Sequence, residues 1–230
     1  INLAAGDVNR DGKAELAVGA DAGGLPVVKV FRVDSGNLAA MTSFLAFSAN
    51  SRRGVRVAMG DINHDGAADL VVGAGVGQLP RVLIYDGKGL AAGSASLLSP
   101  AFLAFATRMT AGVNLAIGDI NGDGFGELIV SQDVGGSSKV RVWSGAAITG
   151  NLSTPVSGLS NYQTFFANGL ADRGGIRVVS RDIDGDGKAE LVTSTASSDA
   201  GWVRVLSVSS TDVTAQAAIF PFSGRSVVAG

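Results

Sequence analysis

The segment GDINHDGAADLVVGA, residues 60–74, decides the fold, because an acidic, glycine-containing loop leads directly into an apolar run. Related segments begin at Gly6, Gly118 and Arg181, and they read GDVNRDGKAELAVGA, GDINGDGFGELIVSQ and RDIDGDGKAELVTST. The leading aspartates of the four segments lie 54, 58 and 63 residues apart. A period of this size indicates a supersecondary unit that is repeated along the chain. We therefore divide the chain into four repeats.

Short apolar runs within each repeat predict strands. In the second repeat they cover residues 55–59, 70–72, 82–85 and the region around Phe102. Short runs separated by Gly, Asp, Asn and Ser are typical of strands joined by tight turns. Four antiparallel strands per repeat form the blade of a β-propeller. We expect an all-β propeller with four repeats, in one domain that covers residues 1–230.

The spacing of the repeats bears on how the blades are arranged. Phe44, Phe102 and Phe165 each stand 11 residues before the first apolar residue of the next repeat. The position 11 residues after Phe220 would be 231, which is Ile1 if the repeats continue around a closed ring. In support of this, INLAAGD at residues 1–7 resembles VRVAMGD at residues 55–61. This pattern favours a closed ring of four blades. Half of an eight-blade ring completed by a second copy, or a segment of a longer array, remains open.

Each repeat carries the pattern D-x-[DN]-x-D-G-x-x-[DE], at residues 7–15, 61–69, 119–127 and 182–190. Calcium takes six to eight oxygen ligands, so it requires several short oxygen-bearing side chains on a tightly turned backbone. An EF-hand would place its last acid at position 12 and helices on both sides, whereas here the acid stands at position 9 between strand-like runs. The pattern predicts calcium loops of the β-propeller kind.

The expected ligands are the side chains at positions 1, 3, 5 and 9 and the backbone carbonyl at position 7. They are Asp7, Asn9, Asp11, Lys13 and Glu15; Asp61, Asn63, Asp65, Ala67 and Asp69; Asp119, Asn121, Asp123, Phe125 and Glu127; and Asp182, Asp184, Asp186, Lys188 and Glu190. Asp and Asn before Gly are also common in ordinary turns. However, thirteen of the 20 acidic residues fall in these four windows, and such crowding opposes folding unless a cation neutralises it. We expect up to four Ca²⁺ ions.

These loops and the strands after them, as in GDINHDGAADLVVGAG, resemble the FG-GAP/VCBS repeats of bacterial exported proteins, which are related to the repeats of integrin α-subunit propellers. The Phe-Gly of the family name is absent, and Arg181 replaces the glycine of the other three repeats. The resemblance implies a secreted or cell-surface protein with calcium at the blade edge. It also implies a surface for glycans or protein partners.

Three functions are compatible with this resemblance. The first is a calcium-stabilised module for adhesion or for surface or matrix assembly, whose partner is a cell-surface or matrix protein or a copy of the chain itself. The second is a lectin, for which Tyr85, Trp143 and Trp202 are candidate sugar-stacking residues. The third is an enzyme similar to polysaccharide lyases, with Arg56 or Arg177 as base. We expect no enzyme, because there is no cysteine and the single histidine, His64, is expected to point outward.

Composition excludes other classes of function. The net charge is −2 and the basic residues are scattered along the chain, so we expect no nucleic-acid binding. No apolar run approaches the roughly 20 residues that span a bilayer. Because cysteine is absent, disulfides cannot stabilise the fold, and we expect metal ions to do so instead.

Overall fold

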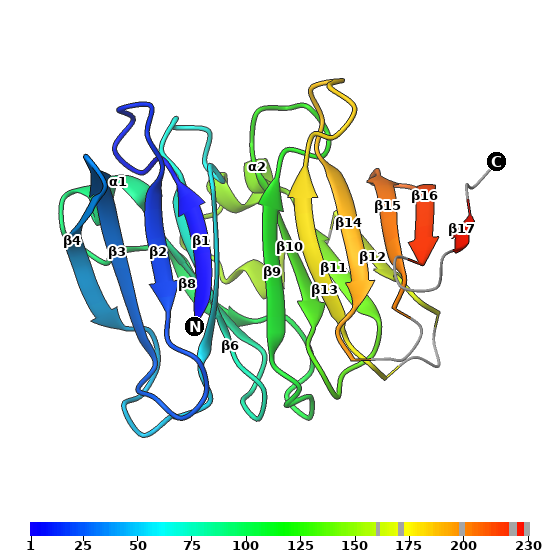
Figure 1. Cartoon of the computed structure of the whole chain (residues 1–230), viewed down its shortest axis with the longest axis horizontal. Coiled ribbons are helices and arrows are strands. Elements are labelled where there is room, and N and C mark those ends of the chain that lie inside the picture. The colour runs from blue at the N-terminus through cyan, green and yellow to red at the C-terminus, as the bar shows by residue number, and fades with distance from the viewer. Residues whose placement is uncertain (160–161, 170–172, 198–200, 221–224, 228–230) are drawn as a thin grey trace.

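The computed structural model describes residues 1–159, 162–169, 173–197, 201–220 and 225–227, and it consists of four antiparallel sheets in a row (Figure 1). The first sheet contains β1 (Asn2–Gly6), β2 (Glu15–Gly19), β3 (Val27–Asp34) and β4 (Asn37–Leu45). The second contains β5 (Val55–Gly60), β6 (Asp69–Ala74), β7 (Arg81–Tyr85) and β8 (Leu97–Leu103). The third contains β9 (Val113–Gly118), β10 (Glu127–Gln132), β11 (Lys139–Trp143) and β12 (Gln163–Phe166). The fourth contains β13 (Ile176–Arg181), β14 (Glu190–Thr195), β15 (Val203–Val208), β16 (Val213–Phe220) and β17 (Arg225–Val227).

Strands follow chain order within each sheet, which confirms the expected four-stranded repeat. The fourth sheet differs, because β17 adds a fifth strand to its outer edge. The register of the first two strands is the same in all four sheets. The residue before the acidic loop pairs with the acid at its ninth position, as in Gly6 with Glu15 and Gly60 with Asp69. Each acidic loop is therefore closed at its base by a strand pair.

Apolar cores lie between successive sheets. The first strands of neighbouring sheets pack side by side, β1 on β5, β5 on β9 and β9 on β13. Strand β11 shows how one strand serves two cores. Its Val140 and Val142 contribute to the core shared with the fourth sheet, whereas Trp143 contributes to the core shared with the second. Alternate side chains of a strand point to opposite faces, so apolar residues on both faces stack the sheets like blades.

The closed ring of four blades that the sequence favours is not formed. The first and fourth sheets lie at opposite ends of the row (Figure 1), and no packing comparable to that of the other first strands joins β13 to β1 in the described part of the chain. Leu3 on β1 is 58% exposed and Val179 on β13 is 61% exposed. Their equivalents between sheets, Leu115 and Ala116, are buried. The row is open, and apolar residues are exposed on the outward faces of the two end sheets.

Short helices, which the sequence did not suggest, follow the third strands of the two middle sheets. They are α1 (Gly87–Ala91) and α2 (Gly145–Thr149), and a 3₁₀ turn, η1 (Val156–Gly158), follows α2. Asp86 and Ser144 cap the two helices by accepting hydrogen bonds from Gly89 N and Ala147 N. Within the described residues, no helix has the length and apolar character that crossing a membrane requires.

Candidate metal loops and neighbouring sites

The four acidic loops lie at the same end of the four sheets, because each connects the first strand of a sheet to the second (Figure 1). The glycine at position 6 has a positive φ in each loop, 83° at Gly12, 83° at Gly66, 87° at Gly124 and 88° at Gly187. Side chains rarely adopt this backbone conformation, which explains why the turn requires glycine.

In the first loop the acidic side chains face inward and organise the turn. Asp7 accepts hydrogen bonds from Arg10 N at 2.6 Å through Oδ1 and from Gly12 N at 2.8 Å through Oδ2. Asn9 Oδ1 accepts from Asp11 N at 2.9 Å. For Asp7, desolvation raises the pKa, but the N–H groups of Gly12 and Arg10 outweigh it, so the pKa lies below its usual value. The loop is thus built to hold a charged Asp7.

The acid at position 9 is buried in every loop, at Glu15, Asp69, Glu127 and Glu190. In each case one of its oxygens accepts the N–H of the residue at position 2, at distances of 2.9 to 3.1 Å. The helices supply a second donor in the middle sheets, because Gly87 N donates to Asp69 at 2.9 Å and Gly145 N donates to Glu127 at 3.4 Å. The first residue of each helix thus helps to fix this acid.

Burial shifts the titration of these acids. It raises the pKa of Asp69 to about 7 and that of Glu127 to about 7, although the backbone N–H groups act in the opposite direction. Burial also raises the pKa of Glu15. Neighbouring loop acids add to the effect, since Asp65 and Asp61 face Asp69. Burying one carboxylate beside other acidic side chains is costly unless a cation accompanies it.

The donor set fits a calcium ion. In the fourth loop, carboxylate oxygens of Asp182, Asp184 and Glu190 all lie within 4.8 Å of one another. The expected carbonyl ligands at position 7 accept no hydrogen bond from any described residue; they belong to Lys13, Ala67, Phe125 and Lys188. Converging carboxylates and uncommitted carbonyls are the all-oxygen environment that calcium prefers.

Successive loops are also linked to each other. The N–H at position 8 of one loop donates to the carbonyl at position 1 of the preceding loop, each time at 2.7 Å, in the pairs Ala68 to Asp7, Gly126 to Asp61 and Ala189 to Asp119. Side chains reinforce the first two links. Arg10 Nη1 donates to Asp65 O at 3.1 Å, and the exposed His64 lies with Nδ1 2.6 Å from Gly124 O. The loops form one continuous chain of contacts.

The candidate sugar-stacking aromatics do not form a platform. Tyr85, Trp143 and Trp202 are 6%, 1% and 4% exposed, respectively. Tyr85 packs on Phe44 with ring centroids 4.6 Å apart, and Trp143 packs edge-on against Phe102 at 5.5 Å. Their placement as ligand-binding residues was wrong, because both faces of a stacked sheet are apolar and draw large rings into the cores between sheets.

The two arginines considered as catalytic bases differ in their surroundings. Arg56 Nη2 lies 2.8 Å from Oδ2 of the buried Asp133, and its Nη1 lies 3.4 Å from Asp21. Arg177 is exposed. Arg56 therefore links the first strand of the second sheet to the third sheet, as an ion pair that neutralises a buried carboxylate.

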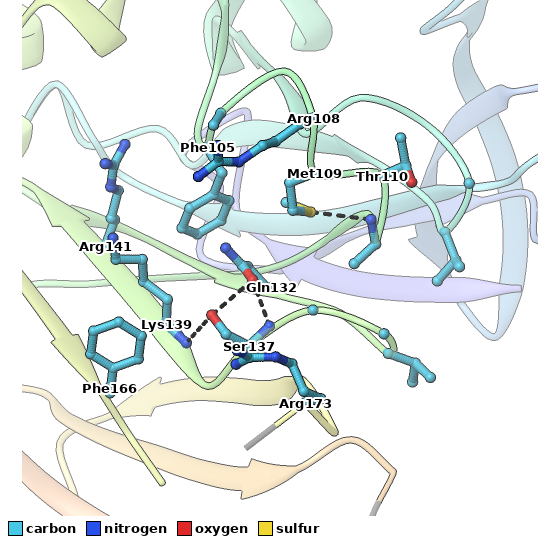
Figure 2. A pocket seen from close by; sticks show the side chains of 17 residues that line it. Phe105, Arg108, Met109, Thr110, Gln132, Ser137, Lys139, Arg141, Phe166 and Arg173 are labelled. Atoms are coloured by element: carbon cyan, nitrogen blue, oxygen red, sulfur yellow. Dashed lines mark hydrogen bonds between the residues drawn. The ribbon is translucent and has the colours of Figure 1, made fainter. Parts of the chain in front are cut away.

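Sequence reasoning missed one group of residues. Basic side chains that are scattered along the chain converge around a pocket between the second and third sheets (Figure 2), at Arg108, Lys139, Arg141 and Arg173. The alternation within β11 is the signal that was available, because Lys139 and Arg141 interrupt the apolar positions on one strand face.

Comparison with known proteins identifies the repeat. Residues 7–72 match the family described as FG-GAP-like repeat. This part of the chain is an FG-GAP-like repeat. This confirms the resemblance drawn from the loop motif and the strand after it. No curated protein sequence matches the chain.

The chain is also similar to parts of larger proteins of known structure. Bacillus licheniformis rhamnogalacturonan lyase PL11 is 13% identical with a TM-score of 0.54, over 83% of this chain and 39% of the lyase. The exotype rhamnogalacturonan lyase YesX is 13% identical with a TM-score of 0.50, over 85% of this chain and 39% of that one. Rhamnogalacturonan lyase YesW is 13% identical with a TM-score of 0.50, over 98% and 49%. The chain thus spans less than half the length of these lyases, and the likeness concerns the fold.

Proposed function

We propose that the chain is a calcium-stabilised extracellular module that assembles through the two ends of its row of sheets, with a second copy of itself as partner. Calcium at the four loops would offset the buried and crowded carboxylates. Extracellular fluids supply calcium at the concentrations that sites of this kind require, with dissociation constants of about 10⁻⁴ to 10⁻³ M.

The observation that carries the assembly role is the pair of exposed apolar end faces. The face of the first sheet that points out of the row carries the apolar residues Ile1, Leu3, Leu16, Val18 and Phe31, around the exposed Lys29. The equivalent residues of the second sheet pack into the core between sheets one and two; they are Val55, Val57, Leu70, Val72 and Tyr85. Neighbouring apolar residues that are exposed to water on one face mark an interaction surface.

The opposite end is complementary. The outward face of the fourth sheet carries the apolar residues Val179, Val192, Val203 and Val205, together with Arg177 and Ser194. Their equivalents in the second sheet are Ala58, Val71, Val82 and Ile84, which are buried against the third sheet. The outward face of the fourth sheet thus corresponds to a face that the next sheet covers elsewhere in the row. The outward face of the first sheet corresponds to a face that the preceding sheet covers. A second copy would extend the packing that already joins the sheets.

An enzymatic role has weaker support. Arg56 is paired with Asp133, and the candidate acids are held by backbone N–H groups in the loops. Rhamnogalacturonan cleavage belongs to proteins that share 13% identity with the chain, which is too low to transfer an activity. We infer that the module binds and assembles.

The calcium half of the proposal is tested by thermal unfolding. At a free calcium concentration ten times the dissociation constant, each site adds about 1.4 kcal/mol, so four sites add about 5 to 6 kcal/mol. For a chain of this size, that corresponds to a rise in Tm of roughly 10 to 20 °C over the value in EDTA. Equal Tm values in EDTA and in calcium would overturn the calcium assignment.

The assembly half is tested by light scattering across a concentration series in calcium. The wild-type chain is expected to dimerise, whereas Leu3→Glu and Val179→Glu should each give a monomer of unchanged circular dichroism. Leu152→Glu is the matched control, because Leu152 is 41% exposed in the connection between α2 and η1, away from the end faces. A monomeric wild-type chain, or equal dissociation by the control, would refute assembly through the ends.

A further inference from the structure

A pocket of about 920 Å³ lies between the second and third sheets, at the end of the sheets opposite the acidic loops. Its walls come from the connections β6–β7, β8–β9 and β10–β11 and from strand β11 (Figure 2). Sites for small molecules commonly have volumes of about 300 to 1,000 Å³. The pocket is therefore large enough for two or three sugar-sized rings.

Positive charge dominates this pocket. Four of its lining residues are basic, and none is Asp or Glu; the basic residues are Arg108, Lys139, Arg141 and Arg173. Figure 2 shows Arg108 on one side of the opening and Arg173 on the other, with Lys139 and Arg141 along the wall between them. Within the described part of the chain, Arg108, Lys139 and Arg141 form no ion pair. In a protein of net charge −2, such a concentration of positive charge is expected to attract an anion.

Arg141 is held rigidly at the wall. Its Nη1 donates to Ala104 O at 2.8 Å, and its guanidinium lies 5.5 Å from the centre of the Phe105 ring. Its Nε is buried without a hydrogen-bond partner among the described residues. The carbonyl contact fixes the side chain but does not neutralise its charge, so a preorganised cation faces the pocket.

The neighbouring groove shows that packing of the sheets does not require these cations. The equivalent groove between the first and second sheets has a volume of about 250 Å³ and contains Phe47 and Arg81 where the larger pocket has Phe105 and Lys139. At the positions of Arg108 and Arg141, however, the repeat that forms the smaller groove has Asn50 and Leu83. Arg204 of the fourth sheet repeats the contact of Arg141, since its Nη1 donates to Ala167 O at 2.6 Å. Sheets therefore pack with or without an arginine at this position, and what distinguishes the larger pocket is the convergence of four basic residues.

The rest of the lining indicates what kind of anion fits. Phe166 is 37% exposed at the rim, with Lys139 Nζ 5.5 Å from its ring centre. The hydroxyl-bearing residues Thr110 and Ser137 also line the pocket. An exposed aromatic ring can pack on the apolar face of a sugar, and the hydroxyl-bearing side chains can form hydrogen bonds with its hydroxyl groups. The cations can form charge-assisted hydrogen bonds with acidic substituents. An open pocket of this size accommodates a short segment, whereas nucleic acid requires an extended basic stripe.

We propose that this pocket binds an acidic oligosaccharide, whose carboxylate or sulfate groups meet Arg108, Lys139, Arg141 and Arg173 while one sugar ring contacts Phe166. The site is separate from the metal loops and from the end faces. Its occupancy is therefore independent of the assembly proposed above, and the two proposals can fail separately.

The test is calorimetric titration of the whole chain in calcium-containing buffer. The probes are a uronic-acid trisaccharide, a sulfated trisaccharide, a neutral trisaccharide and a trinucleotide. We expect at least one acidic sugar to bind, with affinity that falls as salt is raised, and no binding of the neutral sugar. Comparison of the uronic-acid and sulfated probes identifies the acidic group. Absence of binding by both acidic sugars, or tighter binding of the trinucleotide, would overturn the proposal.

Variants locate the site. Arg108→Gln and Lys139→Gln should each weaken acidic-sugar binding by about tenfold, since each removes a charge-assisted contact. Arg81→Gln is the matched control, because Arg81 occupies the position of Lys139 in the smaller groove. All three variants should keep the Tm and the calcium-induced stabilisation of the wild-type chain. Equal loss of binding in the Arg81 variant would place the sugar elsewhere and refute this pocket.

Discussion

Replacing Asp69 by asparagine should stabilise the chain in the absence of calcium and remove the stabilisation that calcium gives through its loop. Burial raises the pKa of Asp69 from 3.8 to about 7 in the folded chain. When burial raises the pKa of an acid in the folded chain, ionising that acid lowers the free energy of unfolding. This penalty is absent below the pKa of the unfolded chain and grows until the pH reaches the pKa of the folded chain. Above neutral pH this penalty reaches about 4 kcal/mol, since one pKa unit corresponds to about 1.4 kcal/mol.

Asparagine removes that penalty but loses one acceptor. Asp69 accepts hydrogen bonds from Gly87 N and Ile62 N, and the amide has one oxygen where the carboxylate has two. One unpaired N–H costs about 1 to 3 kcal/mol, so in EDTA near pH 8 the variant should be about 1 to 3 kcal/mol more stable than the wild-type chain. In calcium at about 100 times the dissociation constant, the variant forgoes the roughly 2.7 kcal/mol that its loop would gain.

The assay is urea unfolding followed by circular dichroism, for the wild-type chain and Asp69→Asn, in EDTA and in calcium. Asp34→Asn serves as control, because Asp34 is about half exposed and lies outside the loops. The control should gain as much stability from calcium as the wild-type chain. If Asp69→Asn gains the full wild-type increment from calcium, or is destabilised in EDTA, the assignment of Asp69 as a calcium ligand is wrong.

Two further substitutions test the packing between sheets. Gly73→Ala should lower the free energy of unfolding by about 1 to 3 kcal/mol, because a Cβ there would lie 2.5 Å from Val113 Cγ2 of the next sheet; Gly24→Ala, where the nearest atom is 3.7 Å away, should change little in the same urea titration. Arg56→Met should destabilise the chain by about 3 to 5 kcal/mol, since it leaves the buried Asp133 unpaired. Adding Asp133→Asn should recover much of that loss, and a double variant no more stable than Arg56→Met would contradict the ion-pair reading.

The strands and the loops were predictable because their signals are local. Alternating or continuous apolar runs bounded by glycine and aspartate define a strand within a few residues, as at Val55–Gly60. The acidic loop likewise contains its own turn chemistry, from the leading Asp7 to the glycine at position 6. The fourth sheet follows the same pattern, although Arg181 replaces glycine at the end of its first strand.

The open row and the basic pocket depend on information that a repeat pattern does not carry. The cyclic phase of the sequence is compatible with a ring of any blade number, because the angle between sheets is set by the side chains packed between them, such as Ala116 and Ile176. Arg108 and Arg173 lie far apart in sequence, and only the stacking of the sheets brings them to the same pocket. The aromatic residues were misplaced for the same reason. The sequence pattern does not distinguish a strand that is buried on both faces, as around Trp143, from a strand with one exposed face.

The hydrogen bonds that join each acidic loop to the preceding one make the loops a one-dimensional lattice with nearest-neighbour coupling. An ion that orders the second loop also fixes Ala68 N, and with it the carbonyl of Asp7 in the first loop. Filling one site should therefore lower the ordering cost of the adjacent site, so that the calcium isotherm rises more steeply than that of independent sites. The four loops would then become ordered together over a narrow range of calcium concentration.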